Sequence, residues 1–333
     1  MIFDISQIIR CLSEEKPFKF KHNNMPDFRR QIKNELLTGR IQDDPCHHMD
    51  NSKYHRRISN HDSETCWLNS CIQLLLVALD YSPNFVMSSS LGKLLELAQS
   101  KTLIDPRPIK RLIQDELDSN SGRYQYILTE QQCARDLLII LGEKEETWRD
   151  VHNLVWQTCK QTITCQNCQA ESFSYATQLY SEVSCPEDNV GLKNFLENNF
   201  NGVGEDLEYL CGSCNVRGIA KQSFQLVTEA SSSYFVVCLK RSEENYSNRV
   251  IATHDITLVD SNNHPRVYTP LSIIYHQGGV EHDVRSVRHY MCDLKDVKND
   301  KWFHTSDASE PKLLKTQQVT KNGFIVLYKR KAE

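Results

Sequence analysis

The sequence has no long hydrophobic run, and this argues against a membrane-spanning protein. No apolar stretch approaches the roughly 20 residues that a helix needs to cross the hydrocarbon core of a bilayer. The first residues, MIFDISQIIRCLSEEKPFKF, also lack the apolar segment and small-residue cleavage site of a secretory signal peptide. We therefore expect an intracellular protein, in the cytoplasm, the nucleus or both, with no membrane partner.

The sequence also has no excess of charge of either sign. Its 39 Lys and Arg residues are balanced by 43 Asp and Glu residues, so no basic surface suited to nucleic acid is indicated. This balance favours a protein or small-molecule substrate and no nucleic-acid partner. Hydrophobic residues make up 39% of the 333 residues, which is enough for the core of one large domain or two ordinary ones.

Cysteine, by contrast, is abundant. The 13 cysteines are odd in number and occur without a signal-peptide pattern, which favours metal-binding or catalytic thiols over a disulfide framework. Two C-x-x-C pairs, Cys165 and Cys168 in CQNC and Cys211 and Cys214 in CGSC, lie about forty residues apart, each at a turn between strand-like segments. Four thiolates at this spacing predict a closed, tetrahedral structural zinc site. The alternative is four unpaired thiols with no metal.

Hydrophobic periodicity divides the chain into a polar extension, a helical part and a strand-rich part. Residues 1–54 are polar and mixed in charge. Apolar residues then recur at three- and four-residue steps, which predicts helices over residues 71–80, 91–100, 108–118 and 131–143. After residue 156, alternating or β-branched runs predict strands near residues 161–165, 223–230, 233–241, 254–259, 270–278, 289–295 and 323–330, with one helix at 189–200. This order predicts an α+β fold with an antiparallel sheet.

Cys66 heads the apolar run in HDSETCWLNSCIQLLLVALD and has two interpretations. A cysteine at the start of an amphipathic helix is often a packed core residue. However, the backbone N–H groups of a helix N-terminus stabilise a thiolate, and Ser63 or Thr65 could cap this helix. A catalytic cysteine also needs a base, which can be distant in the sequence.

His289 is the candidate base among the 12 histidines. It starts a predicted strand in VRHYMCDLKDVKNDKWFHTSDAS, and Trp302 and the polar pair Ser306 and Asp307 follow it. This order could pass a hydrogen bond from a polar group to the imidazole and on to a thiolate. The alternative is a packed or solvated histidine with no catalytic role.

Taken together, these segments resemble the ubiquitin-specific proteases, which are papain-like cysteine peptidases. TCWLNSCIQLLL resembles the cysteine box of this family, and QQCARDLL resembles the short element that follows the box. YFVVCLKRS resembles the strand ending in L-K-R-F, and the segment from YHQGG to GFIVLYKR resembles the histidine box and the final strands. The two C-x-x-C pairs fall where many members carry a zinc ribbon, and the resemblance extends over roughly residues 55 to 330.

The resemblance implies a hand-like catalytic domain over residues 55–333. A helical thumb would cover about 55–155, zinc-ribbon fingers about 156–233 and an antiparallel β palm about 234–333. Cys66 would attack the carbonyl of the C-terminal glycine of ubiquitin or a ubiquitin-like modifier on a target protein. His289 would be the base, oriented by Ser306 with Asp307 in support. The implied function is a deubiquitinating thiol isopeptidase.

Several positions depart from the family pattern and leave a second function open. His61 stands where the family keeps an oxyanion asparagine, and Asn60 precedes it; either could donate a hydrogen bond to the oxyanion. Ser63 and Glu64 replace a glycine and an asparagine, and Arg288 replaces the glycine before the histidine. These changes motivate the alternative of a catalytically inactive scaffold that binds ubiquitin-like or partner proteins.

Overall fold

The computed structural model describes most of the chain after residue 55. The described ranges are 56–60, 65–119, 132–142, 146–185, 191–201, 205–241, 249–277, 289–314, 320–321 and 323–332. The expected extension, residues 1–54, lies outside them. The same holds for His61, Ser63, Glu64 and Arg288.

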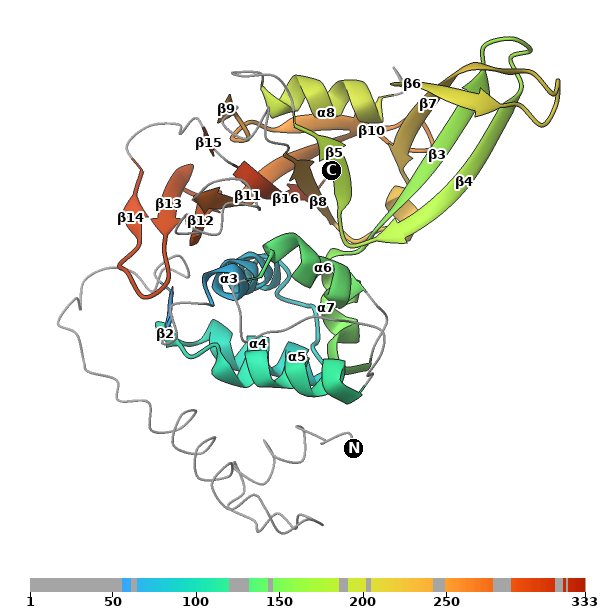
Figure 1. The fold of residues 1–333 in the computed structure, drawn as a ribbon. Helices are drawn as coiled ribbons and strands as arrows, with labels where there is room; N and C mark the ends of the chain where they lie inside the picture. The colour runs from blue at the N-terminus through green and yellow to red at the C-terminus, as the bar shows by residue number, and fades with distance from the viewer. Residues whose placement is uncertain are drawn as a thin grey trace.

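The first part of the described chain is a helical lobe built around one buried helix, α3 (Figure 1). Every residue of α3 except the last is buried, because α4, α6 and α7 pack on one side and strands β11 and β12 on the other. The α-helices of this lobe are α3 (Cys66–Asp80), α4 (Ser90–Gln99), α5 (Arg107–Ser119), α6 (Ala134–Gly142) and α7 (Arg149–Val155), with the short 3₁₀-helix η2 (Glu146–Trp148) before α7. None of the helices in the described part of the chain is long and apolar enough to cross a membrane.

The second part forms a large sheet with the strand order β14-β13-β12-β11-β16-β8-β5, and β10 pairs with β11. Its strands are β5 (Ser181–Ser184), β8 (Tyr234–Lys240), β10 (Ile256–Val259), β11 (Pro265–Gln277), β12 (His289–Asp296), β13 (Lys301–Thr305), β14 (Lys312–Leu313) and β16 (Gly323–Arg330). Alternate residues of β8 and β16 enter two hydrophobic clusters on opposite faces. One cluster includes α3, and the other includes α8 (Leu192–Phe200). The central strands are therefore buried on both faces, which explains their nearly continuous apolar sequences.

A smaller antiparallel sheet projects away from the helical lobe (Figure 1). Its order is β4-β3-β7-β6, with β3 (Gln157–Cys165), β4 (Glu171–Gln178), β6 (Glu205–Leu210) and β7 (Arg217–Leu226). The two C-x-x-C pairs lie at the β3–β4 and β6–β7 turns. Two short pairs complete the described strands: β1 (Arg57–Ile58) with β2 (Leu103–Ile104), and β9 (Arg249–Val250) with β15 (Thr320–Lys321).

The α+β organisation predicted from the sequence is confirmed in this coarse form, with helices first and sheets after them. The large sheet differs in one respect from the expected antiparallel one. β5 adds to its edge parallel to β8, because the chain crosses from the small sheet to the edge of the large one after β4. The thumb, finger and palm bounds stay predictions.

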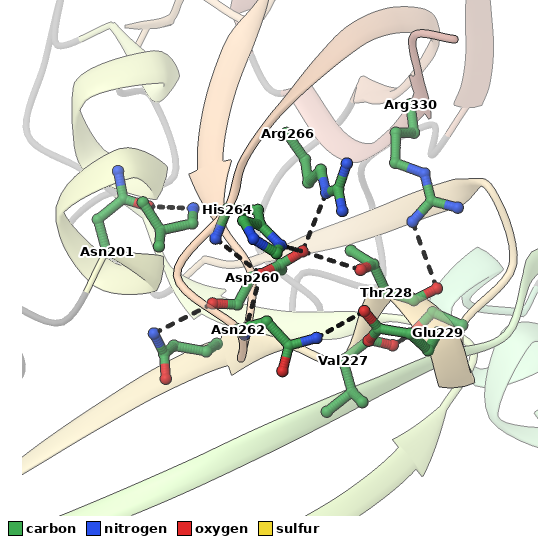
Figure 2. A network of polar contacts seen from close by, with 12 residues as sticks. Asn201, Val227, Thr228, Glu229, Asp260, Asn262, His264, Arg266 and Arg330 are labelled. Carbon is green, nitrogen blue, oxygen red and sulfur yellow. Dashed lines mark hydrogen bonds and ion pairs between the residues drawn. The ribbon is translucent and has the colours of Figure 1, made fainter. Parts of the chain in front are cut away.

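A buried carboxylate joins the two sheets (Figure 2). Asp260, in the turn between β10 and β11, accepts hydrogen bonds from Thr228 Oγ1 at 3.0 Å and Arg266 Nε at 2.9 Å. It also accepts bonds from the backbone N–H groups of Asn262 and His264, both at 2.9 Å. Burial alone would raise the pKa of Asp260, but the bonds from His264, Arg266 and Thr228 outweigh burial and lower it. Because Thr228 lies in η3 (Thr228–Ala230), just after β7, this network ties the base of the small sheet to the large one.

Candidate active site

Cys66 is the first residue of α3 and is almost completely buried, with 1% of its surface exposed. Thr65 occupies the N-cap position, but its side chain makes no capping bond to the helix. Instead, the Thr65 N–H and hydroxyl both donate to Asn60 Oδ1, at 3.1 Å and 2.9 Å. The expectation of a side-chain cap from Thr65 is therefore wrong, since Asn60 takes its hydroxyl. The positive end of the α3 dipole still lies at Cys66, where it favours a thiolate.

His289 is the first residue of β12, and the structure places it against the two polar residues predicted to orient it. Its Nε2 lies 2.8 Å from Ser306 Oγ and 3.9 Å from Asp307 Oδ2. This placement follows from strand pairing: β12 runs antiparallel to β13 with Cys292 opposite Thr305, so the residues after β13 return to the start of β12. Because Nε2 faces Ser306, Nδ1 is the ring nitrogen left to face another partner.

Asp307 connects the histidine to the segments on both sides of Cys66. Its Oδ1 accepts from Asn69 Nδ2 at 2.7 Å, and its Oδ2 accepts from Asn60 Nδ2 at 2.8 Å. The Asp307 carbonyl also accepts from the Ile58 N–H at 3.0 Å. Its backbone has φ of 46°, in the left-handed region that Asp adopts more readily than most residues. One carboxylate therefore holds the turn after β13 against the Asn60 segment and the first turn of α3.

Among the predicted catalytic residues, the structure brings His289, Ser306 and Asp307 into one network. Asn69 links this network to the helical turn that begins at Cys66, and α3 packs directly on β12. The sequence did not assign a role to Asn69. One feature of the sequence could have indicated this role. Asn69 is a polar residue in an apolar run and lies three residues after Cys66, and residues three apart in a helix share a face.

Asn60, one of the two predicted oxyanion donors, has its carboxamide already engaged. Its oxygen accepts from Thr65 and its Nδ2 donates to Asp307. If the amide were rotated, its oxygen would lie against an oxygen of Asp307. The hydrogen-bond partners therefore fix which end of the amide is oxygen and which is nitrogen. One N–H of Nδ2 remains for another acceptor.

The four predicted metal ligands form one cluster. Their Sγ atoms all lie within 4.8 Å of one another, with Cys165 and Cys214 at 3.9 Å and Cys168 and Cys211 at 3.7 Å. A tetrahedral zinc with Zn–S bonds of about 2.3 Å has sulfur–sulfur edges of about 3.8 Å. Four cysteines in this arrangement could hold a metal such as zinc.

The backbone around the cluster has the same shape in both pairs. The residue after each second cysteine, Gln169 or Asn215, has positive φ, 61° and 56°, and its N–H donates to the carbonyl of the first cysteine at 2.9 Å. These turns direct both sulfurs of each pair to one side. Backbone N–H groups of Cys214 and Ser213 lower the pKa of the Cys211 thiol to about 6, whereas a backbone hydrogen bond to Cys168 is outweighed by burial and the neighbouring thiols, which raise its pKa to about 12. The Cys211 thiol is therefore favoured as the thiolate that binds metal.

Other cysteines have the environment of packing residues. Burial raises the pKa of Cys71 and Cys238 well above the usual value, and both are fully buried. Neither cysteine stands at a helix N-terminus as Cys66 does, and a thiol whose pKa is raised in this way is a poor nucleophile. Cys71 lies in the same helix as Cys66 and therefore offers a matched control for experiments on Cys66.

No protein-family model matches the sequence, and no curated protein matches it. Among solved structures, the fold is similar to that of a chain in the SAGA DUB module, which contains Ubp8 with a Cys-to-Ala substitution, Sgf11, Sus1 and Sgf73 and is bound to monoubiquitin. The TM-score is 0.55, the sequence identity is 14%, and the match covers 93% of this chain and 76% of the other. At this identity the likeness shows a shared fold.

Proposed function

We propose that the protein is a cysteine-type deubiquitinase, a thiol isopeptidase that hydrolyses the bond after the C-terminal glycine of ubiquitin or a ubiquitin-like modifier on target proteins. The observation that carries the proposal is the network in which His289 contacts Ser306 and Asp307, while Asp307 contacts the helix that Cys66 begins. The fold shared with a chain of a ubiquitin-bound DUB module supports the substrate class. The family-like order of the sequence motifs supports it as well.

In this proposal Cys66 is the nucleophile and His289 the base. The helix N-terminus favours the thiolate, and His289 Nδ1 takes the thiol proton because Nε2 is held by Ser306. Asp307 then faces the resulting imidazolium at 3.9 Å from Nε2. Ser306 thus orients the ring by a hydrogen bond, and Asp307 supplies the negative charge.

The reaction proceeds through a thioester. The Cys66 thiolate attacks the carbonyl carbon of the terminal glycine, and the amine of the target leaves with the proton held by His289. A water molecule, deprotonated by His289, then hydrolyses the thioester and releases the modifier. Candidate oxyanion donors are His61 and the remaining N–H of Asn60. One such donor contributes about 3–4 kcal/mol to transition-state stabilisation in comparable sites.

The four cysteines would hold a structural zinc ion at the end of the small sheet. A closed four-sulfur site supplies folding free energy and leaves no open position for a substrate. The helical lobe would act as the thumb, the small sheet as the fingers and the large sheet as the palm. The modifier would lie against fingers and palm, with its extended tail directed to Cys66. A cytoplasmic or nuclear location stays part of this proposal.

The second candidate is an inactive scaffold that binds the modifier without cleaving it. The engagement of Asn60 by Asp307 and Thr65 favours this candidate, because it leaves at most one amide proton for an oxyanion. Fluorogenic ubiquitin and SUMO substrates distinguish the two functions when turnover and binding are measured on the same preparation.

An enzyme shows turnover that Cys66→Ala abolishes and Cys71→Ala retains, since Cys71 is a packing residue of the same helix. Binding without turnover, equal in the wild type and in Cys66→Ala, would identify the scaffold. Neither binding nor turnover with any modifier would refute both functions.

A further inference from the structure

A small cavity lies beside the candidate catalytic network, between α3 and strands β12 and β13. Its lining includes Asn69, Ser70 and Gln73 of α3, Cys292 and Thr305 of the large sheet, and Asp307. Its volume is about 10 Å³, close to the space that a single buried water requires. Five of the seven lining residues are polar, and the other two are Ile58 and Cys292.

Two residues of this lining, Asn69 and Gln73, each carry a buried oxygen without a hydrogen-bond donor among the described residues. Asn69 Oδ1 and Gln73 Oε1 are buried and accept from no group within the described part of the chain. Each of these side chains is 3% exposed. Because the two residues are four apart in α3, they share the helix face that borders the cavity. A buried acceptor without a donor is costly, and in native proteins it is normally satisfied by a protein group or an ordered water.

The orientations of both amides are fixed by their nitrogen atoms. Asn69 Nδ2 donates to the Ser59 carbonyl at 3.2 Å and to Asp307 Oδ1 at 2.7 Å. Gln73 Nε2 donates to the Arg56 carbonyl at 2.9 Å. Rotating either amide would set an oxygen against these acceptors, so the unpaired oxygens cannot be exchanged for nitrogens. The cavity therefore requires a group with two hydrogen-bond donors.

We propose that this cavity binds one ordered water molecule, which donates its two hydrogens to Asn69 Oδ1 and Gln73 Oε1. The Ser70 hydroxyl lines the same cavity and can donate a third bond to the water oxygen. A metal cation fits less well, because it needs several oxygens at about 2.0–2.6 Å and both oxygens of Asp307 already accept amide N–H groups. The water is the ligand that matches the donor requirement and the size.

The water has a consequence for the site. It fixes the carboxamide of Asn69, whose nitrogen holds Asp307, and so makes Asn69 a positioning residue for His289. This second step rests on the proposed function, whereas the water site itself does not.

A crystal structure that resolves ordered waters tests the site directly. The expected result is one isolated density peak about 2.7–3.0 Å from both Asn69 Oδ1 and Gln73 Oε1. An empty cavity would overturn the proposal. A peak with several oxygen ligands near about 2.3 Å would also overturn it, because that distance identifies a cation.

Substitutions at Ser70 give a second test. Ser70→Val fills the cavity and displaces the water, whereas Ser70→Ala leaves room for it. The same Ala and Val pair at Asn194, an exposed position of α8, measures the intrinsic helix preference of valine. At each position we compare the melting temperature of the Val variant with that of the Ala variant. We expect the Val variant to melt lower at position 70, by about 2–6 °C more than at position 194, because the displaced water leaves two acceptors without a donor. An equal or smaller difference at position 70 would indicate a dry void and would overturn the proposal.

The positioning role has its own readout. With ubiquitin or SUMO carrying a C-terminal electrophile, Ser70→Val should slow labelling at saturating probe relative to Ser70→Ala, with the half-saturating concentration unchanged. Unchanged labelling rates would overturn the positioning step. If the wild type reacts with no probe, the proposed function fails, while the density peak and the melting temperatures still decide the water site.

Discussion

Replacing Asp307 is the most informative perturbation of the proposed site. Asp307→Ala removes a carboxylate that accepts two amide N–H groups, from Asn60 at 2.8 Å and Asn69 at 2.7 Å. It also removes the negative charge 3.9 Å from His289 Nε2. The substitution therefore loosens the contact between β12 and α3 and withdraws the charge that faces the imidazolium.

The expected loss of kcat/KM follows from the distance between His289 and Asp307 and from the exposure of their side chains. Two unit charges about 4 Å apart attract by about 1 kcal/mol in bulk water and about 4 kcal/mol at an effective dielectric of about 20. The His289 and Asp307 side chains are 29% and 15% exposed, so the site lies between these limits. We expect kcat/KM to fall by about 5-fold to about 1,000-fold.

Ser306→Ala provides the comparison within the network. It removes one hydrogen bond of 2.8 Å to the imidazole, which contributes about 0.5–1.5 kcal/mol, so we expect a loss of about 2-fold to 10-fold. Asp118→Ala, at an exposed position of α5, controls for the removal of a surface carboxylate. The assay is hydrolysis of a fluorogenic modifier, with the fraction of active enzyme titrated by an electrophilic probe. The reasoning is refuted if Asp307→Ala stays within about 2-fold of the wild type while Cys66→Ala is inactive.

Three further predictions concern stability. Metal analysis should return about one zinc per chain, and Cys165→Ser should lose both the metal and thermal stability because zinc binding contributes to folding; a metal-free wild type would contradict this. Asp80→Ala should lower the free energy of unfolding in urea by about 3–5 kcal/mol, because it leaves the buried Arg56 without its charge partner. Both side chains of this pair are 5% exposed. Asp206→Ala, in the exposed pair with Lys221, should cost about 0–1 kcal/mol, and losses equal to those of Asp80→Ala would contradict the difference expected between buried and exposed pairs. Asp260 has a lowered folded-state pKa, so its stabilisation is fully present above the unfolded value of about 3.9 and is lost as the pH falls through the folded-state pKa. The urea midpoint of Asp260→Asn should therefore be lower than that of the wild type at pH 7 and converge with it in acid, and parallel pH curves would contradict this.

Most of the helices and the central strands were predictable from the sequence because they bury one or both faces, whereas α7 was not predicted. α3 and α4 repeat apolar residues with helical spacing, and β8 and β16 are apolar runs because hydrophobic clusters cover both faces of the large sheet. β4 was not predicted. Nearly all of its residues are exposed, so no burial pattern marks it, and only pairing with β3 makes it a strand.

The cluster of four cysteines was predictable for a different reason. The short C-x-x-C spacing fixes two sulfurs locally, and the two turns then need only meet, as they do across the antiparallel small sheet. The antiparallel pairing of β3 with β7 brings the two turns to the same end of the small sheet. The sequence does not show that pairing, but the spacing within and between the two cysteine pairs was sufficient to expect the four sulfurs to come together.

The catalytic roles of the candidate residues stay predictions, and the sequence did not indicate how these residues connect. The order of motifs indicated His289, Ser306 and Asp307, and the structure brings them together. The roles of Asn60 and Asn69 as partners of Asp307 depend on the approach of α3 to the turn after β13, residues more than two hundred positions apart in the sequence. No local pattern encodes such a contact. The buried acceptors of Asn69 and Gln73 were invisible for the same reason.

In the proposed mechanism Cys66 is a nucleophile that His289 activates. The most direct measurement is the reaction of the full chain with ubiquitin and SUMO that carry C-terminal electrophiles, followed by peptide mass spectrometry to locate the adduct. We expect a single adduct on Cys66, retained in Cys71→Ala and lost in a folded His289→Ala variant. An adduct on another cysteine, no adduct with either modifier, or labelling of Cys66 that does not depend on His289 would contradict it.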